Sequence, residues 1–181
     1  MSSVVISGDT SGAITLSAPA VAGTNTLTLP ATTGTIVTTG SPQSGSVLQV
    51  VYGSTSTFVS SSSSTYADTG LSVSITPKFS TSKILVLVDH NGTNKDGSGA
   101  ISMGVRIVRN STTILTYGTG EGLSSATLVR FGSTSASYLD SPATTSATTY
   151  KTQFSSVGNN ASVALQVDSA VSTMTLMEIA G

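Results

Sequence analysis

Short runs in which apolar residues alternate with Ser or Thr recur along the chain, and this pattern most constrains the fold. Leu71, Val73 and Ile75, for example, alternate with Ser72 and Ser74. A period of two places the apolar side chains on one face of a β-strand. Turn-forming residues separate such runs about every ten residues, whereas helical spacing of apolar residues is not sustained. The pattern predicts an all-β protein, a β-sandwich or barrel with essentially no helix.

Composition excludes several classes of function. Ser and Thr make up 64 of the 181 residues, charged residues make up 8%, and the formal net charge is −1. The few scattered cations form no basic patch for nucleic acid, and no apolar run approaches the length of a membrane span. The chain contains no cysteine, which excludes disulfides and thiolate metal sites. We expect no cofactor, and a nearly neutral surface fits a protein built into an assembly.

Residues 12–37 have the features of an extended arm. Residues 13–16 and 25–29 alternate Thr with apolar residues, and a third run follows at 35–38. A proline follows each of the first two runs closely, and proline cannot donate to a sheet ladder. Strands this short cannot bury a core of their own, so the arm needs a partner surface. The side chains predicted to dock there are Ile14, Leu16, Val21, Leu27, Leu29 and Ile36.

A hinge separates this arm from a compact domain. Residues 41–45, Ser-Pro-Gln-Ser-Gly, contain a proline, a glycine and no large apolar side chain. Such a composition is typical of a linker. The chain is therefore divided into an arm (1–40), a hinge (41–45) and a β-sandwich domain (46–181).

Residues 84–88 (ILVLV) form the longest apolar run, and they do not alternate. Such a run is predicted to be covered on both faces, as a central strand or as a strand at a subunit interface. In the last run, residues 173–179, Met174 and Leu176 point away from the remaining apolar side chains. The residues predicted to form the core or a subunit contact are Ile84, Leu85, Val86, Leu87, Val88, Met174 and Leu176.

Polar and glycine-rich stretches predict loops. Residues 90–99 (HNGTNKDGSG) favour a turn at almost every position, which would place Lys95 at an exposed tip. Residues 118–122 are predicted to be a flexible loop, and 54–65 to be mostly exposed loops. Residues 158–160 (GNN) predict a tight hairpin turn.

The stretch SGAITLSAPAVAGTNTLTLPATTGTIV resembles the leader of many tailed-bacteriophage virion proteins, especially tail-fibre-like and other appendage proteins. This resemblance covers roughly the first forty residues. The segments TYADTGLSVSITPKFSTSKILVLV, SYLDSPATTSATTYKTQF and TMTLMEI resemble the small jelly-roll-like head domains attached to phage fibres. The resemblance implies a jelly-roll-like domain, a homotrimer, and a place on the virion after synthesis in the host cytoplasm.

Candidate catalytic and metal-binding residues are few. Ser11 is flanked by glycines, as in trypsin-like proteases, but a serine nucleophile needs a histidine base. The single histidine, His90, stands in the predicted turn. Beside it, Asp89 could make a pH-sensitive pair with His90, and Asp89 and Asp96 offer oxygens for a cation, fewer than calcium prefers. The sequence favours a protein that is not an enzyme.

Arg106 is the charged side chain for which a structural partner is expected. It lies on the polar face of an alternating strand. An ion pair with Glu178 or Asp168 is predicted, between strands or between subunits. If exposed, such a pair contributes little to stability.

These features predict a non-enzymatic structural protein of a tailed-phage particle, a homotrimeric surface appendage docked by its N-terminal arm. It would be a capsid decoration or cement protein, a head fibre or a short tail fibre, and its partners would be capsid or tail proteins. The alternative is a tail-fibre tip that binds a host surface glycan. That function needs an exposed aromatic platform, and the chain has five Tyr, four Phe and no Trp.

Overall fold

The structure is a computed structural model, and it describes the chain except for residues 1–2, 18, 22, 25, 27–30, 35–36, 98, 125–127 and 158–160. For residues 3, 99–100, 119–124 and 128–131 it describes the backbone alone. The chain divides into two compact units, Met1–Val37 and Thr38–Gly181. The predicted strand at 25–29, the run at 35–38 and the GNN turn fall wholly or partly outside the described residues.

The described secondary structure is β-strand apart from one short 3-10 turn. The first unit holds a two-stranded antiparallel ribbon, β1 (Ser3–Ser7) and β2 (Ala13–Ser17). The second unit holds β3 (Val47–Thr55), β4 (Val59–Ser61), β5 (Ala67–Ile75), β6 (Lys83–Asp96), β7 (Gly99–Arg109), β8 (Thr112–Ser124), β9 (Leu128–Asp140), β10 (Thr148–Val157), β11 (Ser162–Leu165), η1 (Val167–Ser169) and β12 (Ser172–Ile179). The prediction of an all-β chain is confirmed.

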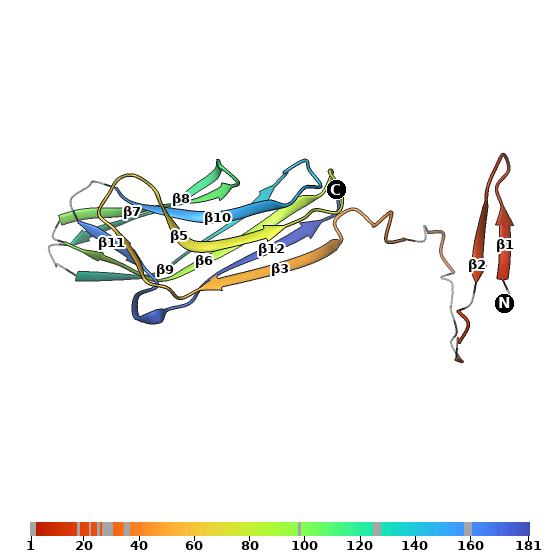
Figure 1. The fold of residues 1–181 in the computed structure, drawn as a ribbon, viewed down its shortest axis with the longest axis horizontal. Coiled ribbons are helices and arrows are strands. Elements are labelled where there is room, and N and C mark those ends of the chain that lie inside the picture. Colours follow the sequence, from red (N-terminus) through yellow and green to blue (C-terminus); the bar gives the residue numbers. More distant parts are fainter. Residues whose placement is uncertain are drawn as a thin grey trace. The chain divides into compact units, whose positions relative to one another are not determined.

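The second unit is a sandwich of two antiparallel sheets (Figure 1). The β7 sheet has the strand order β5-β10-β7-β8. The β6 sheet has the order β3-β12-β6-β9, and the short strands β11 and β4 continue it where β12 and β3 end. These two orders, with the chain passing between the sheets at most connections, are those of a jelly roll. The expected jelly-roll-like sandwich is therefore present.

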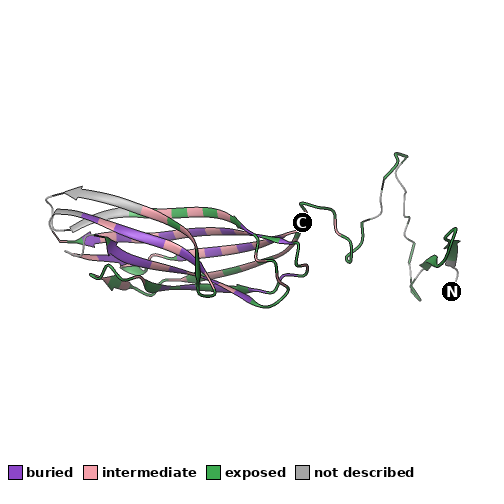
Figure 2. Ribbon diagram, turned by 90° about the horizontal axis from the view of Figure 1, so that it is seen from above, coloured by how far each residue is buried: buried purple, intermediate pink, exposed green. Residues whose placement is uncertain are grey.

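Two apolar clusters fill the space between the sheets. The proximal core cluster lies towards the end of the sandwich where β3 begins and β12 ends, and the distal core cluster lies beyond it. The proximal cluster consists of Leu71, Val73, Ile75, Ile84, Val86, Val88, Ile107, Tyr150, Met174 and Leu176. The distal cluster consists of Ile101, Met103, Val105, Phe154, Val163 and Leu165. The alternation of buried and less buried residues along these strands follows the period of two (Figure 2).

The turn predicted at residues 90–99 is wrong. β6 continues through this stretch to Asp96, and His90, Thr93 and Lys95 are wholly or almost wholly buried. The turn-forming pair Asn91 and Gly92 makes a bulge instead, because the pairing register with β9 shifts between His90 and Thr93. Long-range pairing with strands on both sides of β6 therefore outweighs the local turn propensity of residues 90–96.

Two other predicted loops are corrected in the same way. Residues 118–122 belong to β8, where they pair with β7 beyond a register shift. Within the polar stretch 54–65, residues 59–61 form β4 against β11. Glycine and serine weaken a strand only modestly, so a neighbouring strand suffices to hold them extended.

The bulge in β6 receives a left-handed turn that follows β11. Gln166, Asp168 and Ser169 have φ values of 58°, 56° and 60°, a conformation that costs a non-glycine residue about 1–2 kcal/mol. The turn packs directly on Gly92, where a Cβ atom would lie 2.6 Å from the backbone nitrogen of Val167. Gly92 therefore has to be a glycine for the turn to sit in the bulge.

We predict that Gly92→Ala destabilises the sandwich by about 3 kcal/mol or more. The alanine would combine left-handed strain with displacement of a packed backbone. Gly132→Ala is the matched control, because Gly132 also has a positive φ of 87° but nothing lies within 4 Å of its added Cβ. It should cost about 1–2 kcal/mol. Urea unfolding of both variants measures the difference, and equal losses would contradict the close packing at Gly92.

Candidate functional site

An apolar row crosses four strands on the outer face of the β6 sheet. Val50 pairs with Met177, Met177 with Leu85, and Leu85 with Leu139. Residues that pair directly across antiparallel strands share a face of the sheet, and Ile84 beside Leu85 points into the core. Val50 and Leu139 are 56% and 52% exposed, and Met177 and Leu85 are half-buried.

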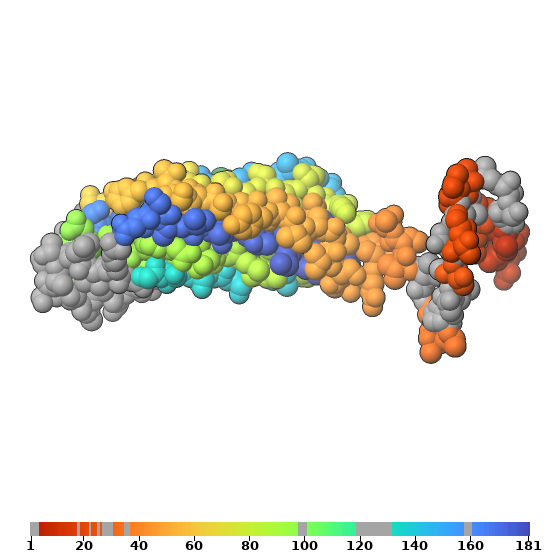
Figure 3. Space-filling view, turned by 90° about the horizontal axis from the view of Figure 1, so that it is seen from below, coloured from red at the N-terminus to blue at the C-terminus, as the bar shows by residue number. Residues whose placement is uncertain are grey.

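Neighbouring positions widen this row into a patch. Tyr52 pairs with Thr175 and Thr175 with Leu87 on one side, and Val47 pairs with Ile179 on the other. The four strands lie as adjacent bands on this side of the molecule, orange β3, blue β12, green β6 and cyan β9 (Figure 3). We call the patch the apolar face; it consists of Val47, Val50, Tyr52, Leu85, Leu87, Leu139, Met177 and Ile179. Contiguous exposed apolar surface of this kind marks interaction sites.

The outer face of the β7 sheet is polar by contrast. Gln153 lies between Asp68 and Arg106 in the strand pairing. Its Nε2 donates to Asp68 Oδ1 at 2.7 Å, and its Oε1 accepts from Arg106 Nε and Nη2 at 2.8 and 2.6 Å. Lys151 forms an ion pair with Asp68 at 2.9 Å. The largest influence on the pKa of Asp68 is the hydrogen bond from Lys151, which holds that pKa below its ordinary value.

Within one chain, Arg106 pairs with neither of its predicted partners. Its guanidinium binds Gln153 and stacks on the ring of Tyr66, with 4.1 Å between Cζ and the ring centroid. Glu178 and Asp168 lie elsewhere, on β12 and in η1. The sequence placed Arg106 on the correct face of its strand, but cross-strand register decides the partner, and register is a long-range property.

The ribbon of the first unit is a second apolar surface. Val4 pairs with Leu16 and Ile6 with Ile14, which puts all four side chains on one face. They are between 49% and 67% exposed. Every described residue from 4 to 37 is exposed (Figure 2). An isolated two-stranded ribbon is marginally stable in water.

The residues predicted for docking and for the core separate into distinct groups. Ile14, Leu16 and Val21 are exposed in the first unit, and Leu27, Leu29 and Ile36 lie outside the described residues. Ile84, Val86, Val88, Met174 and Leu176 belong to the proximal core cluster. Leu85 and Leu87 face outward into the apolar face.

Sequence reasoning missed half of the apolar face. The sequence pattern does not mark Val47, Val50, Tyr52 and Leu139 as contact residues, and it marks Met177 and Ile179 only as pointing away from Met174 and Leu176. The available signal was the residues VLQVVY at 47–52, which carry apolar side chains on both faces as ILVLV does. That these strands are neighbours of β6 could not be read from their spacing along the chain.

The candidate chemical residues do not come together. His90 is buried inside the sandwich and Ser11 lies in the first unit. Asp89 and Asp96 stand seven residues apart on one extended strand, about 20 Å, too far to share a cation. Among the described residues, no three His, Cys, Asp or Glu side chains are grouped to hold a metal ion.

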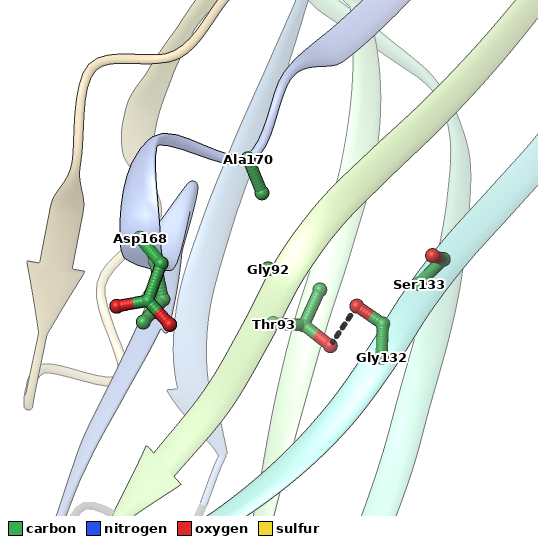
Figure 4. A pocket seen from close by; sticks show the side chains of 7 residues that line it. Gly92, Thr93, Gly132, Ser133, Asp168 and Ala170 are labelled. Carbon is green, nitrogen blue, oxygen red and sulfur yellow. Dashed lines mark hydrogen bonds between the residues drawn. The ribbon is translucent and has the colours of Figure 1, made fainter.

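A shallow pocket of about 310 Å³ lies where β6, β9 and the left-handed turn meet (Figure 4). Its lining residues are Gly92, Thr93, Gly132, Ser133, Val167, Asp168 and Ala170. Thr93 Oγ1 donates to the carbonyl of Gly132 at 3.2 Å across the pocket floor. The hollow follows from the bulge and from two glycines without side chains. We assign it no ligand.

A buried carboxylate holds the proximal end of the sandwich. Glu178 is wholly buried and accepts from Gln49 Nε2 at 2.6 Å and from the backbone nitrogens of Lys78 and Phe79 at 2.7 and 3.4 Å. Burial alone would raise the pKa of Glu178, but these hydrogen bonds together lower it below its ordinary value. At the same end, the backbone of Ala180 exchanges hydrogen bonds with Gly45 and Ser46, which tie the start of the domain to its last strand.

Comparison with solved structures gives a distant likeness. No protein-family model and no curated protein matches the chain. Among solved structures, the chain is similar to the VP2 subviral particle of infectious bursal disease virus, with 14% identity and a TM-score of 0.39 over 75% of this chain and 34% of that one. The chain thus spans about a third of the length of that protein. Within the described residues, no helix is long and apolar enough to cross a membrane.

We predict that Glu178→Gln destabilises the domain by about 1.5–3 kcal/mol at pH 7, since it weakens hydrogen bonds to a charged acceptor. Because the folded pKa of Glu178 lies below its ordinary value of 4.5, its contribution is present above that pH and is lost as pH falls through the folded pKa. Urea unfolding at pH 7 and pH 3 should therefore show a smaller gap between variant and parent at pH 3. Asp96→Asn, which removes an exposed carboxylate, is the control. We call Glu178 with its three donors the Glu178 clamp; a Glu178→Gln variant as stable as the parent at pH 7 would contradict it.

Proposed function

We propose that this chain is a non-enzymatic structural protein of a tailed-phage particle, which assembles as a homotrimer through the apolar face and docks on the particle by its N-terminal arm. The observation that carries the proposal is the apolar face itself. It spans four strands of a chain that is 8% charged, while the opposite sheet shows a polar face. A folded sandwich buries one side of each sheet, so this second side needs another protein.

Another copy of the same chain is the occupant that best fits this face. The face is a sheet surface of mostly aliphatic side chains with Tyr52 and Met177, and its rim charges on β6, Lys83 and Asp89, have opposite signs. A copy therefore brings apolar area without adding net repulsion, in a protein whose formal charge is −1. A threefold arrangement is supported by the resemblance of the leader and of the domain to phage appendage proteins, and closed rings are the usual form of such assemblies.

The arm supports attachment to a larger particle. Its described residues are all exposed, and its ribbon turns Val4, Ile6, Ile14 and Leu16 to one face. A segment with so little burial does not offset the entropy of ordering it alone. On a particle it would bind a capsid or tail protein, in the role of a decoration or cement protein, a head fibre or a short tail fibre.

The glycan-binding alternative has one observation in its favour. Tyr52 and Phe58 are 61% and 58% exposed, and exposed aromatic rings can receive sugars. Tyr52, however, lies within the apolar face beside Thr175. Glycan binding through Tyr52 requires that its ring stay accessible in the assembled trimer, whereas the proposed contact covers this ring.

We predict that the purified protein sediments as a trimer, with three times its chain mass of 18.1 kDa. Leu139→Asp should sediment as a monomer, because a carboxylate buried without a partner costs several kcal/mol. Leu139 is half exposed in the single chain, so the variant should keep its fold. Ser72→Asp, on the polar face of the β7 sheet, is the matched control and should stay trimeric. A monomeric parent would overturn the trimer, and a trimeric Leu139→Asp would overturn the assigned face.

We predict that removal of residues 1–40 leaves the sandwich folded but abolishes incorporation into particles. The hinge end of the domain is held by hydrogen bonds between residues 45–46 and Ala180, which the truncation retains. Particles produced in its presence would be purified and assayed for the protein, with the full chain as control. Incorporation of the truncated chain at the level of the full chain would contradict docking by the arm.

A further inference from the structure

Three polar side chains form a hydrogen-bonded layer across the core of the sandwich. Thr69, His90 and Thr152 are each 0% exposed. His90 Nε2 lies 3.0 Å from Thr152 Oγ1, and Thr152 Oγ1 lies 2.6 Å from Thr69 Oγ1. Thr69 Oγ1 is also 3.3 Å from the carbonyl of Thr152 and accepts from the backbone nitrogen of Leu71 at 3.1 Å. The layer therefore joins β6 in one sheet to β5 and β10 in the other.

This polar layer separates the two core clusters. On β10, Thr152 stands between Tyr150 of the proximal cluster and Phe154 of the distal cluster. On β6 and β5, His90 and Thr69 each occupy the next core-facing position beyond the proximal cluster. Apolar packing is thus interrupted at one level across three strands, while Tyr117 on β8 packs against both clusters.

We propose that His90 is an acid-operated latch, whose protonation opens the distal half of the sandwich while the proximal half stays closed. The distal half comprises the distal core cluster with the short strands β4 and β11. The proximal half comprises the proximal core cluster, with the Glu178 clamp and the attachment of the arm. The inference concerns the fold of one chain and does not depend on the proposed assembly.

The hydrogen bonds around His90 fit a neutral imidazole with one N–H donor and offer no acceptor for the second N–H of a protonated ring. With Nε2–H donating to Thr152 Oγ1, the threonine hydroxyls can each donate onward, to Thr69 Oγ1 and to the carbonyl of Thr152. Nδ1 of His90 is buried and has no hydrogen-bond partner among the residues that the structure describes. A protonated ring has two N–H donors, so protonation would leave a charged donor unsatisfied in the core, which is costly.

The surroundings of His90 also favour its neutral form. Burial lowers the pKa of His90 to about 4, and the charge of Asp89 opposes this effect in part. Other ionisable side chains on the packed elements are Lys95 further along β6, Tyr150 on β10 and Tyr117 on β8, and burial raises the pKa of both tyrosine hydroxyls. On β5 and β10, Asp68 and Lys151 face outward from the β7 sheet. Asp89 is therefore the one anion among these groups that acts on His90 directly.

The distal half has the features of a region that opens locally. Its outer strands β4 and β11 have three and four residues. It also borders the bulge at Gly92 and the left-handed turn at residues 166–169. Short strands and strained backbone give low local stability. An opened distal half exposes His90, whose pKa then rises towards its ordinary value of 6.5.

The sign of the pH dependence follows from these two values. The opened state binds a proton more readily than the closed state between about pH 6.5 and pH 4, so closure weakens as pH falls through this window. Between pH 7 and pH 5 the opening equilibrium of the distal half should increase by roughly 20–30-fold. The proximal half should show no change from this cause.

Hydrogen exchange of the intact protein at pH 7 and pH 5, corrected for intrinsic rates, tests the latch. The amides of residues 101–105 and 163–165 should lose roughly 20–30-fold protection, and those of residues 84–88 and 174–176 should keep theirs. In His90→Gln the difference between the two pH values should vanish. Loss of protection in both halves together, or in neither, would overturn the proposal.

A second measurement needs no variant. The chain has a single histidine, so its imidazole proton signals in an NMR titration belong to His90 without ambiguity. The signals of the closed protein should not titrate above about pH 5. A closed-state titration near pH 6.5 would show that His90 accepts a proton within the packed core, and the latch would be excluded.

Discussion

Strand β6 has apolar side chains on both of its faces, and the rest of the structure depends on how these are covered. Inward, Ile84, Val86 and Val88 are buried against the β7 sheet. Outward, Leu85 and Leu87 make the other side of the β6 sheet apolar as well. One sandwich covers one side of each of its sheets. Folding therefore uses the first face, and in the proposed trimer assembly uses the second.

Two buried carboxylates, Glu178 and Asp140, hold the domain together from the inside. Glu178 receives backbone and side-chain donors at the proximal end. Asp140 accepts from Arg109 at 2.8 Å and from the hydroxyl of Tyr150 at 2.7 Å, and burial first, then this carboxylate, raises the pKa of Tyr150. Buried charges need such partners. Because charged residues are few and some of them are paired inside the domain, the exterior is nearly neutral, which suits close packing against copies.

The two halves of the sandwich differ in how their backbone is held. The proximal half combines long paired strands with the Glu178 clamp. The distal half contains a bulge at Gly92, a strained turn and two very short strands. The polar layer at His90 and Thr152 lies at their boundary. The proximal half is also the half in which Ala180, directly after the last strand, is hydrogen-bonded to residues 45 and 46 at the end of the hinge.

The sequence by itself determined the all-β class, most strand positions and the orientation of alternating side chains such as Leu71 and Met174, because a period of two is a local property. Tertiary structure alone decided that His90 is buried, that Arg106 binds Gln153, and that strands distant in sequence join Leu85 in one apolar face. Those outcomes depend on which strands are neighbours and in what register. Pairing of that kind is non-local, and it overrides the turn preference of residues 90–99.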